Sequence, residues 1–315
     1  MAWLLLPLSY VYRLLLTFDR ALRSGRRTGG RVPVVVIGNL TVGGTGKTPL
    51  VIWLARALRE RGLSPGIVSR GYGGSRRAPR RVRATDSPAD VGDEPIVLAR
   101  NAGCPVVVCA DRRAAAAVLE RDETIDVILS DDGLQHHALA RDCEIVVVDG
   151  ARGLGNGLCL PAGPLREPVA RLDRVDAIIV NGGGWSHPEG IVARLEVTGV
   201  ERLDGTASRN IASFNGQRVH AFAAIGHPQR FFDLLERHGI SVVAHAKADH
   251  AYISPMELAT VTSAIMITEK DAVKLGPETP GDIWCVKVDY VFESGGAERL
   301  LATVLDRLAP EAAAS

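Results

Sequence analysis

The segment Thr41-Val-Gly-Gly-Thr-Gly-Lys-Thr48 contains three glycines and ends in a lysine followed by a threonine. It is the strongest single indication of the fold. It follows an apolar run at residues 32–37 and precedes a helical pattern at 49–61. Glycines let backbone amides turn toward phosphate oxygens, while the lysine reaches the β- and γ-phosphates and the threonine hydroxyl coordinates Mg2+. We therefore predict a phosphate-binding loop for ATP and Mg2+, made by Thr41, Val42, Gly43, Gly44, Thr45, Gly46, Lys47 and Thr48. The general pattern of such loops has glycine where this chain has Thr41.

Short β-branched runs alternate with helical stretches on both sides of this loop. Buried strands are predicted at residues 32–37, 66–69, 106–109, 127–130, 145–149 and 177–181, with helices clearest at 49–61 and 112–121. Continuous apolar strands that alternate with helices indicate a parallel sheet covered on both faces. The predicted fold is therefore an α/β, phosphate-loop NTPase type of sheet flanked by helices, which binds ligands at the carboxyl ends of its strands.

A second α/β series begins near residue 219. It contains predicted strands at 219–225, 241–245, 264–268 and 283–288 and a helix at 228–237. The stretch 192–217 has an alternating, turn-like character and is predicted to link the two series. We expect an N-terminal helix at 1–30, a kinase-type domain at 31–205 and a smaller domain at 206–315 that closes over the site.

Two adjacent carboxylates, Asp131 and Asp132, end the predicted strand at 127–130. In phosphate-loop kinases a carboxylate at such a strand end holds Mg2+, directly or through water. Adjacent side chains on extended backbone point to opposite sides, so the pattern leaves open which of the two faces the metal.

Composition points to an ordinary globular protein. Of the 315 residues, 46% are hydrophobic and 23% charged, and the formal net charge is +1, which favours no polyanionic partner such as nucleic acid. The cysteines are odd in number and lack CxxC spacing, so we expect a reducing compartment and no cysteine metal site: Cys104, Cys109, Cys143, Cys159 and Cys285.

The N-terminal segment 4–16 is almost wholly apolar but is interrupted by Pro7 and Arg13, and it is shorter than the roughly 20 residues of a spanning helix. Arginines follow it at positions 20, 23, 26, 27 and 31. This order suits a helix on a membrane surface, and an amphipathic helix packed on its own domain fits equally well. In the first case the residues entering the headgroup boundary would be Trp3, Leu4, Leu5, Leu8, Tyr12, Leu15 and Leu16.

Six separated segments together resemble one family, tetraacyldisaccharide 4′-kinase of the lipid A pathway. They are residues 37–49 around the loop, Ser-Arg-Gly-Tyr-Gly at 69–73, Gly-Asp-Glu-Pro at 92–95, Asp-Asp-Gly-Leu-Gln-His at 131–136, Leu-Pro-Ala-Gly-Pro-Leu-Arg-Glu at 160–167 and Thr-Glu-Lys-Asp at 268–271. The family shares the threonine at position 41.

This resemblance implies transfer of the ATP γ-phosphate to the 4′-hydroxyl of a tetraacylated glucosamine disaccharide 1-phosphate, by a peripheral protein on the cytoplasmic face of the inner membrane. It implies that Asp93 is the base near the acceptor hydroxyl, paired with His250, which can orient it and share the proton. Glu167 would join Thr48, Asp131 and Asp132 at the metal. No obligate protein partner is implied. The chain departs from the family at Lys247, where phenylalanine is usual, and at Ala251, where a second histidine is frequent.

Other interpretations of these residues stay open. Asp93 and Glu94 precede Pro95 and would also suit the start of a helix. Arg112, Arg113 and Arg166 either neutralise phosphate charge or are solvated surface residues. His136 and His137 are more typical of an exposed loop than of a catalytic pair.

The main alternative function is a membrane-associated ATPase switch of the partitioning type, which has a similar loop. Those proteins carry a signature lysine before the double glycine, where this chain has Val42. A GTPase is disfavoured because the lysine of residues 268–271 lies one place too late for the guanine-reading pattern.

Overall fold

The parallel sheet predicted around the loop is present in the computed structural model, which describes residues 2–24, 30–74, 78–122 and 124–309. Its strands lie in the order β7-β6-β1-β5-β2-β4 and are all parallel, with the short β3 antiparallel at the edge. The bounds are β1 Val34–Gly38, β2 Pro65–Ser69, β3 Arg80–Arg81, β4 Val106–Val108, β5 Val127–Asp131, β6 Cys143–Asp149 and β7 Ala177–Asn181. We call these strands and their helices the N-terminal part.

Helices cover both faces of this sheet, which explains the continuous apolar runs. Alternate β1 residues point to opposite faces: Val35 and Ile37 pack with α2 (Lys47–Glu60), α4 (Asp93–Asn101) and α9 (Gly296–Leu308). Val34 and Val36 pack with α5 (Arg112–Leu119). The shorter helices are α3 (Pro88–Val91) and η2 (Val169–Arg174).

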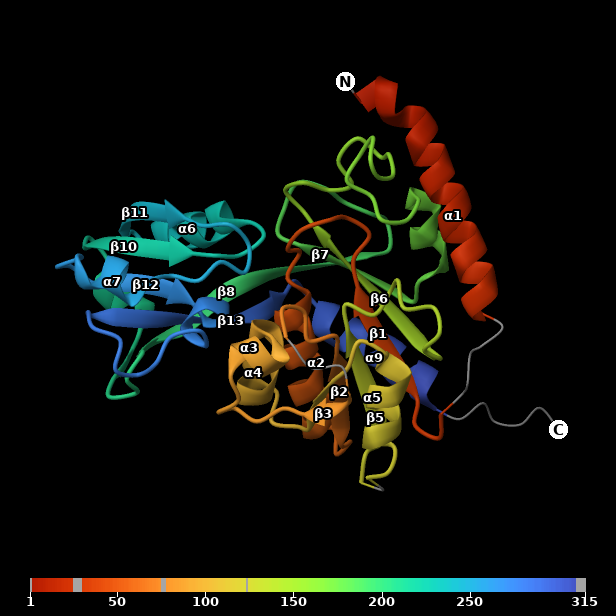
Figure 1. Ribbon diagram of the computed structural model, residues 1–315, viewed down its shortest axis with the longest axis horizontal. Coiled ribbons are helices and arrows are strands. Elements are labelled where there is room, and N and C mark those ends of the chain that lie inside the picture. The colour runs from red at the N-terminus through yellow and green to blue at the C-terminus, as the bar shows by residue number, and fades with distance from the viewer. Residues whose placement is uncertain (1, 25–29, 75–77, 123, 310–315) are drawn as a thin grey trace.

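The second series forms a C-terminal part on the same sheet (Figure 1). Its parallel strands are β10 (Arg218–Ala223), β11 (Ser241–Ala246) and β12 (Ile265–Thr268), with helices α6 (Pro228–Arg237), α7 (Pro255–Ala259) and α8 (Glu269–Ala272). The long strands β8 (Gly190–Arg202) and β13 (Ile283–Phe292) pair antiparallel and join the two parts. The stretch 192–217 is thus largely strand β8, followed by β9 (Ser208–Arg209) and η3 (Ile211–Phe214), rather than a turn-like linker. After β13 the chain returns to the N-terminal part, where α9 packs against β6 and β8.

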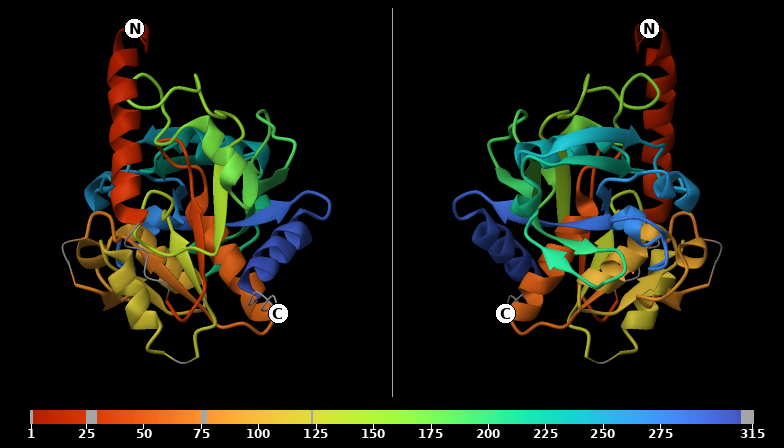
Figure 2. Two further views of the ribbon diagram at one scale, coloured as in Figure 1. Left: turned by 90° about the vertical axis from the view of Figure 1, so that its right-hand side faces the viewer. Right: turned by 90° about the vertical axis from the view of Figure 1, so that its left-hand side faces the viewer.

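The N-terminal helix α1 (Leu6–Ser24), preceded by η1 (Ala2–Leu5), lies along the N-terminal part, and its first turns extend past the body (Figure 2). One side is fixed by hydrogen bonds from Ser9 Oγ to the Cys159 carbonyl at 2.8 Å and from Tyr12 Oη to the Arg166 carbonyl at 3.0 Å. Tyr12 therefore packs on the body instead of facing outward as predicted. Large apolar side chains still cover the outer side: Trp3, Leu4, Leu8, Val11, Leu14, Leu15, Phe18 and Leu22.

Both interpretations of this helix find support, because it packs on its own domain and also exposes an apolar face. Arg26 and Arg27 lie outside the described residues. Within the described residues, no helix has the length and apolar character needed to cross a bilayer.

Candidate active site

The phosphate loop connects β1 to α2 and is held by side chains from distant strands. Gly46 has φ 96°, and a Cβ there would lie 2.4 Å from Asn181 Nδ2 and 2.5 Å from Tyr290 Oη. Asn181 Nδ2 donates to the Thr45 carbonyl at 2.8 Å, and Tyr290 Oη donates to the Gly46 carbonyl at 3.1 Å. Glycine is therefore required at position 46, and the loop conformation is fixed by its surroundings.

Asn39 completes the loop, although the sequence analysis did not single it out. It is fully buried, and its Nδ2 donates to the carbonyls of Thr41 at 2.7 Å and Gly43 at 3.2 Å. Its Oδ1 accepts a hydrogen bond from Lys47 Nζ at 3.1 Å. Asn39 thus fixes both the loop backbone and the direction of the lysine.

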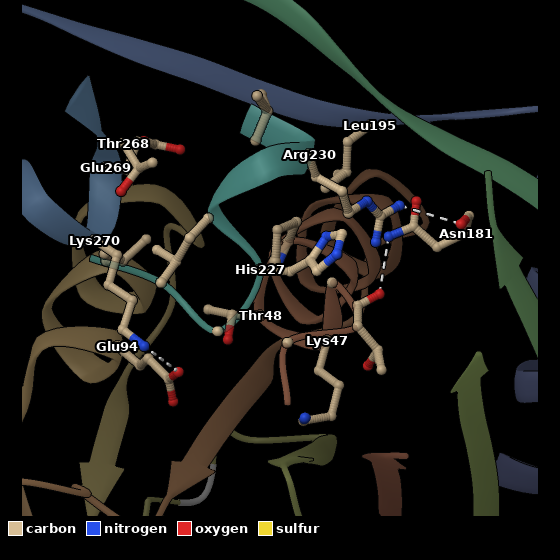
Figure 3. A pocket seen from close by; sticks show the side chains of 18 of the residues that line it. Lys47, Thr48, Glu94, Asn181, Leu195, His227, Arg230, Thr268, Glu269 and Lys270 are labelled. Carbon is tan, nitrogen blue, oxygen red and sulfur yellow. Dashed lines mark hydrogen bonds and ion pairs between the residues drawn. The ribbon is translucent and has the colours of Figure 1, made fainter. Parts of the chain in front are cut away.

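The loop opens into a cavity of about 1390 Å³ between the two parts of the sheet. Figure 3 shows Lys47 and Thr48 at this cavity together with Lys270 and Glu94. Ten of the predicted site residues line it: Gly43, Gly44, Thr45, Gly46, Lys47, Thr48, Asp131, Asp132, Arg166 and His250. Thr41 and Val42 do not, because they bridge to the backbone of residues 164–165.

The two carboxylates after β5 have different surroundings. Asp131 is 2% exposed, and its Oδ1 has no hydrogen-bond partner. Burial, together with the neighbouring charges of Glu94 and Asp132, raises the pKa of Asp131 to about 7. Asp132, in a left-handed conformation at φ 49°, lies 3.4 Å from Lys47 Nζ and 3.3 Å from Arg166 Nη1. Asp131 therefore has one carboxylate oxygen without a hydrogen-bond partner, whereas the carboxylate of Asp132 is already paired with two cations.

These residues fit Mg2+. An unpaired buried carboxylate oxygen is costly unless a cation satisfies it, and Asp131 lines the same cavity as Thr48. Within the described ranges no group of three or more His, Cys, Asp or Glu side chains forms a metal cluster. Mg2+ in kinase sites needs only one or two carboxylates, because substrate phosphates and water complete its shell.

Glu167 lies beside this site rather than in the cavity wall. Its Oε1 accepts a hydrogen bond from Gln135 Nε2 at 2.9 Å, and its Oε2 lies 3.3 Å from Arg171 Nε. Both oxygens thus have protein partners, and Glu167 stays a predicted metal residue.

The sequence left the role of three arginines undecided, and the structure places them in different surroundings. Arg113 is not among the residues that line the cavity and pairs with Asp111 at 3.0 Å, as expected for a solvated surface residue. Arg112 is buried and lines the cavity, where its Nη2 donates to the carbonyls of Asp131 at 3.3 Å and Asp132 at 2.9 Å. Arg166 lines the cavity beside Asp132.

Asp93 and His250 are 157 residues apart in sequence but in contact in the fold. Asp93 begins α4, is 5% exposed and accepts a hydrogen bond from the Glu94 amide at 2.8 Å. His250 Nδ1 lies 3.1 Å from Asp93 Oδ1 and 3.0 Å from Oδ2. The carboxylate therefore both starts a helix and pairs with the imidazole.

The histidine, not the aspartate, forms part of the cavity wall. His250 holds a left-handed conformation at φ 62°, and its amide donates to the Ala224 carbonyl at 3.1 Å. Such a conformation in a residue other than glycine costs free energy and is typical of functional sites.

Two lysines of the C-terminal part surround this pair, and the sequence analysis gave them no role. Lys270 Nζ lies 3.1 Å from His250 Nε2, and Lys274 Nζ lies 3.6 Å from Asp93 Oδ2. The only signal was that Lys270 belongs to the segment at 268–271 that carried the family resemblance.

Comparisons with known proteins agree with this geometry. The family profile of LpxK, tetraacyldisaccharide-1-P 4′-kinase, matches residues 1–306. The chain is 46% identical to a tetraacyldisaccharide 4′-kinase of Pseudomonas aeruginosa strain LESB58 over 294 residues, covering 91% of this chain and 89% of the relative. It is 48% identical to the Azotobacter vinelandii strain DJ protein of the same name over 263 residues, covering 82% and 79%.

Among solved structures, LpxK from Aquifex aeolicus in complex with ATP superposes with a TM-score of 0.79 at 25% identity, covering 98% of this chain and 99% of that chain. The predicted α/β fold is thereby confirmed. Together with the match over nearly the whole length, these similarities establish that the chain belongs to the tetraacyldisaccharide-1-phosphate 4′-kinase family.

Proposed function

We propose that this protein transfers the γ-phosphate of ATP to the 4′-hydroxyl of a tetraacylated glucosamine disaccharide 1-phosphate, a step of lipid A biosynthesis. One observation carries the proposal beyond family membership. The phosphate loop and His250, with Asp93 behind it, meet at one cavity between the two parts of the molecule. A nucleotide on the loop and an acceptor near the pair would therefore face each other.

ATP binding rests on the loop. Its backbone amides and Lys47 would hold the phosphates, and Thr48 with Asp131 would hold Mg2+, assisted by Asp132 and Glu167. Mg2+, when bound, neutralises charge on the phosphate oxygens. Lys47 already lies on the cavity wall, so its charge would contact the migrating phosphoryl group without rearrangement of the loop.

Proton transfer is assigned to the Asp93–His250 pair. As the acceptor oxygen forms its bond to the γ-phosphorus, the bond from that phosphorus to the ADP oxygen breaks. The proton of the acceptor hydroxyl passes to the pair. In a tightly coupled pair the proton belongs to both groups, so we assign it to the pair as a unit.

Arg112 and Arg166 complete the proposed charge balance. Both line the cavity, so both can stabilise the negative charge of the transferred phosphoryl group. Arg113 is left out because it pairs with Asp111 on the surface.

The exposed apolar face of α1 supports peripheral membrane attachment, and we propose the cytoplasmic face of the inner membrane as its location. Leu14 is 71% exposed and Phe18 is 64% exposed, and they belong to a row of exposed apolar residues. Such a face binds at the boundary of headgroups and acyl chains. Attachment there would bring the cavity close to a substrate whose acyl chains lie in the bilayer.

A direct test is to incubate the protein with ATP, Mg2+ and the tetraacyldisaccharide 1-phosphate and to measure the mass of the extracted lipid. A gain of one phosphate on the lipid supports the proposal. ATP hydrolysis that is independent of the lipid, with no phosphorylated lipid, would instead favour the ATPase switch.

A further inference from the structure

Lys270 links three acidic or basic groups at the interface of α4 and α8. Its Nζ lies 3.2 Å from Glu94 Oε1, 3.0 Å from Asp249 Oδ1 and 3.1 Å from His250 Nε2. Figure 3 shows its side chain directed toward Glu94. One ammonium group therefore contacts both the N-terminal part and the proposed proton-transfer pair.

The ammonium group determines which nitrogen of His250 carries the proton. A lysine ammonium has three donors and no acceptor, so His250 Nε2 must accept the hydrogen bond and cannot itself be protonated. A neutral imidazole then carries its proton on Nδ1. That nitrogen faces both oxygens of Asp93, which is an acceptor when ionised.

Lys270 has this effect on His250 only while it stays charged. Burial opposes the ammonium form, but the carboxylates of Glu94, Asp93 and Asp249 outweigh it and raise the pKa of Lys270 above its ordinary value. Lys270 is thus a permanent donor at neutral pH.

We propose that Lys270 is a positioning residue that holds His250 as the neutral tautomer protonated on Nδ1. In this form His250 orients Asp93 by donating to it, and Asp93 enters the reaction ionised. This inference rests on the proposed role of the pair in proton transfer. It makes that role more specific, because before the reaction the proton belongs to His250 and Asp93 is ionised.

The surroundings of His250 show what Lys270 prevents. Asp93 lies on one side of the ring and Asp249 Oδ1 lies 3.7 Å from Nε2 on the other. The Tyr72 ring also lies next to the His250 ring, with 5.0 Å between centroids, and Lys274 is adjacent to Asp93. Without the Lys270 charge, two carboxylates would favour a doubly protonated imidazolium that can neither accept a proton nor leave Asp93 free to act.

The test compares Lys270→Met and Lys270→Arg with the full-length wild type. Histidine is labelled with 15N, and the His250 signals are identified from their loss in His250→Ala. Wild type is expected to show one protonated nitrogen, Nδ1, at neutral pH. In Lys270→Met both nitrogens become protonated, and the midpoint of the titration moves up by about one pH unit or more. Lys270→Arg retains the charge and stays close to wild type.

Kinetics give a second readout. An imidazolium that persists at neutral pH predicts a kcat at pH 7 that is lower for Lys270→Met by up to about tenfold and recovers as pH rises, with an unchanged KM for ATP. The matched control is Lys247→Met, which breaks the 2.7 Å pair with Glu257 in the same part of the molecule but does not touch His250. We expect wild-type spectra and rates from this control.

A wild-type spectrum with the proton on Nε2, or with both nitrogens protonated at neutral pH, would overturn the inference, and this holds even if Lys270→Met fails to fold. An unchanged His250 titration in folded Lys270→Met would also overturn it. These outcomes concern the resting enzyme. They therefore differ from failure of the proposed role of the pair, which would appear as full activity in Asp93→Ala or His250→Ala.

Discussion

Arg230 of α6 and Asp149 at the end of β6 form an ion pair between the two parts of the molecule, with 3.1 Å between Nη1 and Oδ2. The Asp149 side chain is fully buried and also pairs with Arg152, whose Nη2 donates to the Gly44 carbonyl at 2.8 Å. One buried carboxylate therefore connects the C-terminal part to the phosphate loop.

Asp149→Ala is expected to lower the free energy of unfolding by about 3 kcal/mol, because removing one partner of a buried ion pair leaves uncompensated charge. We expect a value at the low end of the range for losing one partner of a buried ion pair, because both arginines retain some solvent contact. Urea denaturation measures it. Arg307→Ala, which removes a solvent-exposed arginine from its pair with Asp176, should cost less than about 1 kcal/mol. Equal losses in the two variants would contradict the special role of Asp149.

Lys47→Ala is expected to lower kcat by on the order of 10²-fold or more, since a preorganised positive charge at the migrating phosphoryl group is lost. Steady-state phosphorylation of the lipid acceptor measures the effect, and Lys247→Ala serves as the surface control. Turnover near the wild-type rate in Lys47→Ala would refute the phosphate-loop assignment.

The unpaired oxygen of Asp131 predicts an unequal response of the two adjacent carboxylates to Mg2+. Asp131→Asn should raise the Mg2+ concentration for half-maximal activity by roughly tenfold or more. Mutation of a residue that only hydrogen-bonds to a metal ligand already has an effect of that size. Asp132→Asn should change this concentration less, because Asp132 is paired with Lys47 and Arg166. Titrating activity with Mg2+ at saturating ATP separates them, and the reverse order would exchange their roles.

Local sequence patterns predicted β1, β2, β4, β5, β6 and β7 and the helices α2 and α5 to within a few residues, but not β3, α3 or α9. They did not predict that β8 runs through the expected linker, because its half-buried alternation depends on pairing with β13, whose residues lie about 90 positions later. The division into domains at residues 205 and 206 stays a prediction, since one sheet runs through both parts.

The site shows the same limit. The phosphate loop and the Asp131–Asp132 pair are local motifs, so they could be predicted from the residues themselves. The pairing of Asp93 with His250 was predicted only from the family resemblance. Asn39 and Lys270 were missed because their importance depends on contacts that only the fold brings together.

The outer face of α1 predicts that Leu14→Asp together with Phe18→Asp moves the protein from the membrane fraction to the soluble fraction. Both side chains are exposed, so the fold should be retained, whereas deleting the helix would also remove the Ser9 and Tyr12 contacts. Attachment of the wild type should weaken at high salt, which screens attraction between arginines and anionic lipids. Met256→Asp, at an exposed apolar residue of α7, is the control. Unchanged partitioning of the double variant would make α1 a structural element only.

The Asp93–His250 contact predicts non-additive effects on catalysis. Asp93→Ala and His250→Ala should each lower kcat by about 10²-fold or more, the usual contribution of a positioned base, while the KM for ATP stays nearly unchanged. The double variant should be little worse than the poorer single variant, because residues that act as a unit are strongly non-additive. Asp93→Ala should have the larger effect, since the carboxylate carries the negative charge of the pair.

The pH dependence distinguishes a proton-transfer role from a binding role in these same variants. The residual rate should rise with pH in each of them, because more of the acceptor hydroxyl is then ionised without help from the enzyme. Measuring kcat for both single variants and the double variant across pH decides the question. Losses that multiply, with flat pH profiles, would mean two independent roles, and His250 would then be a substrate-binding residue on the cavity wall.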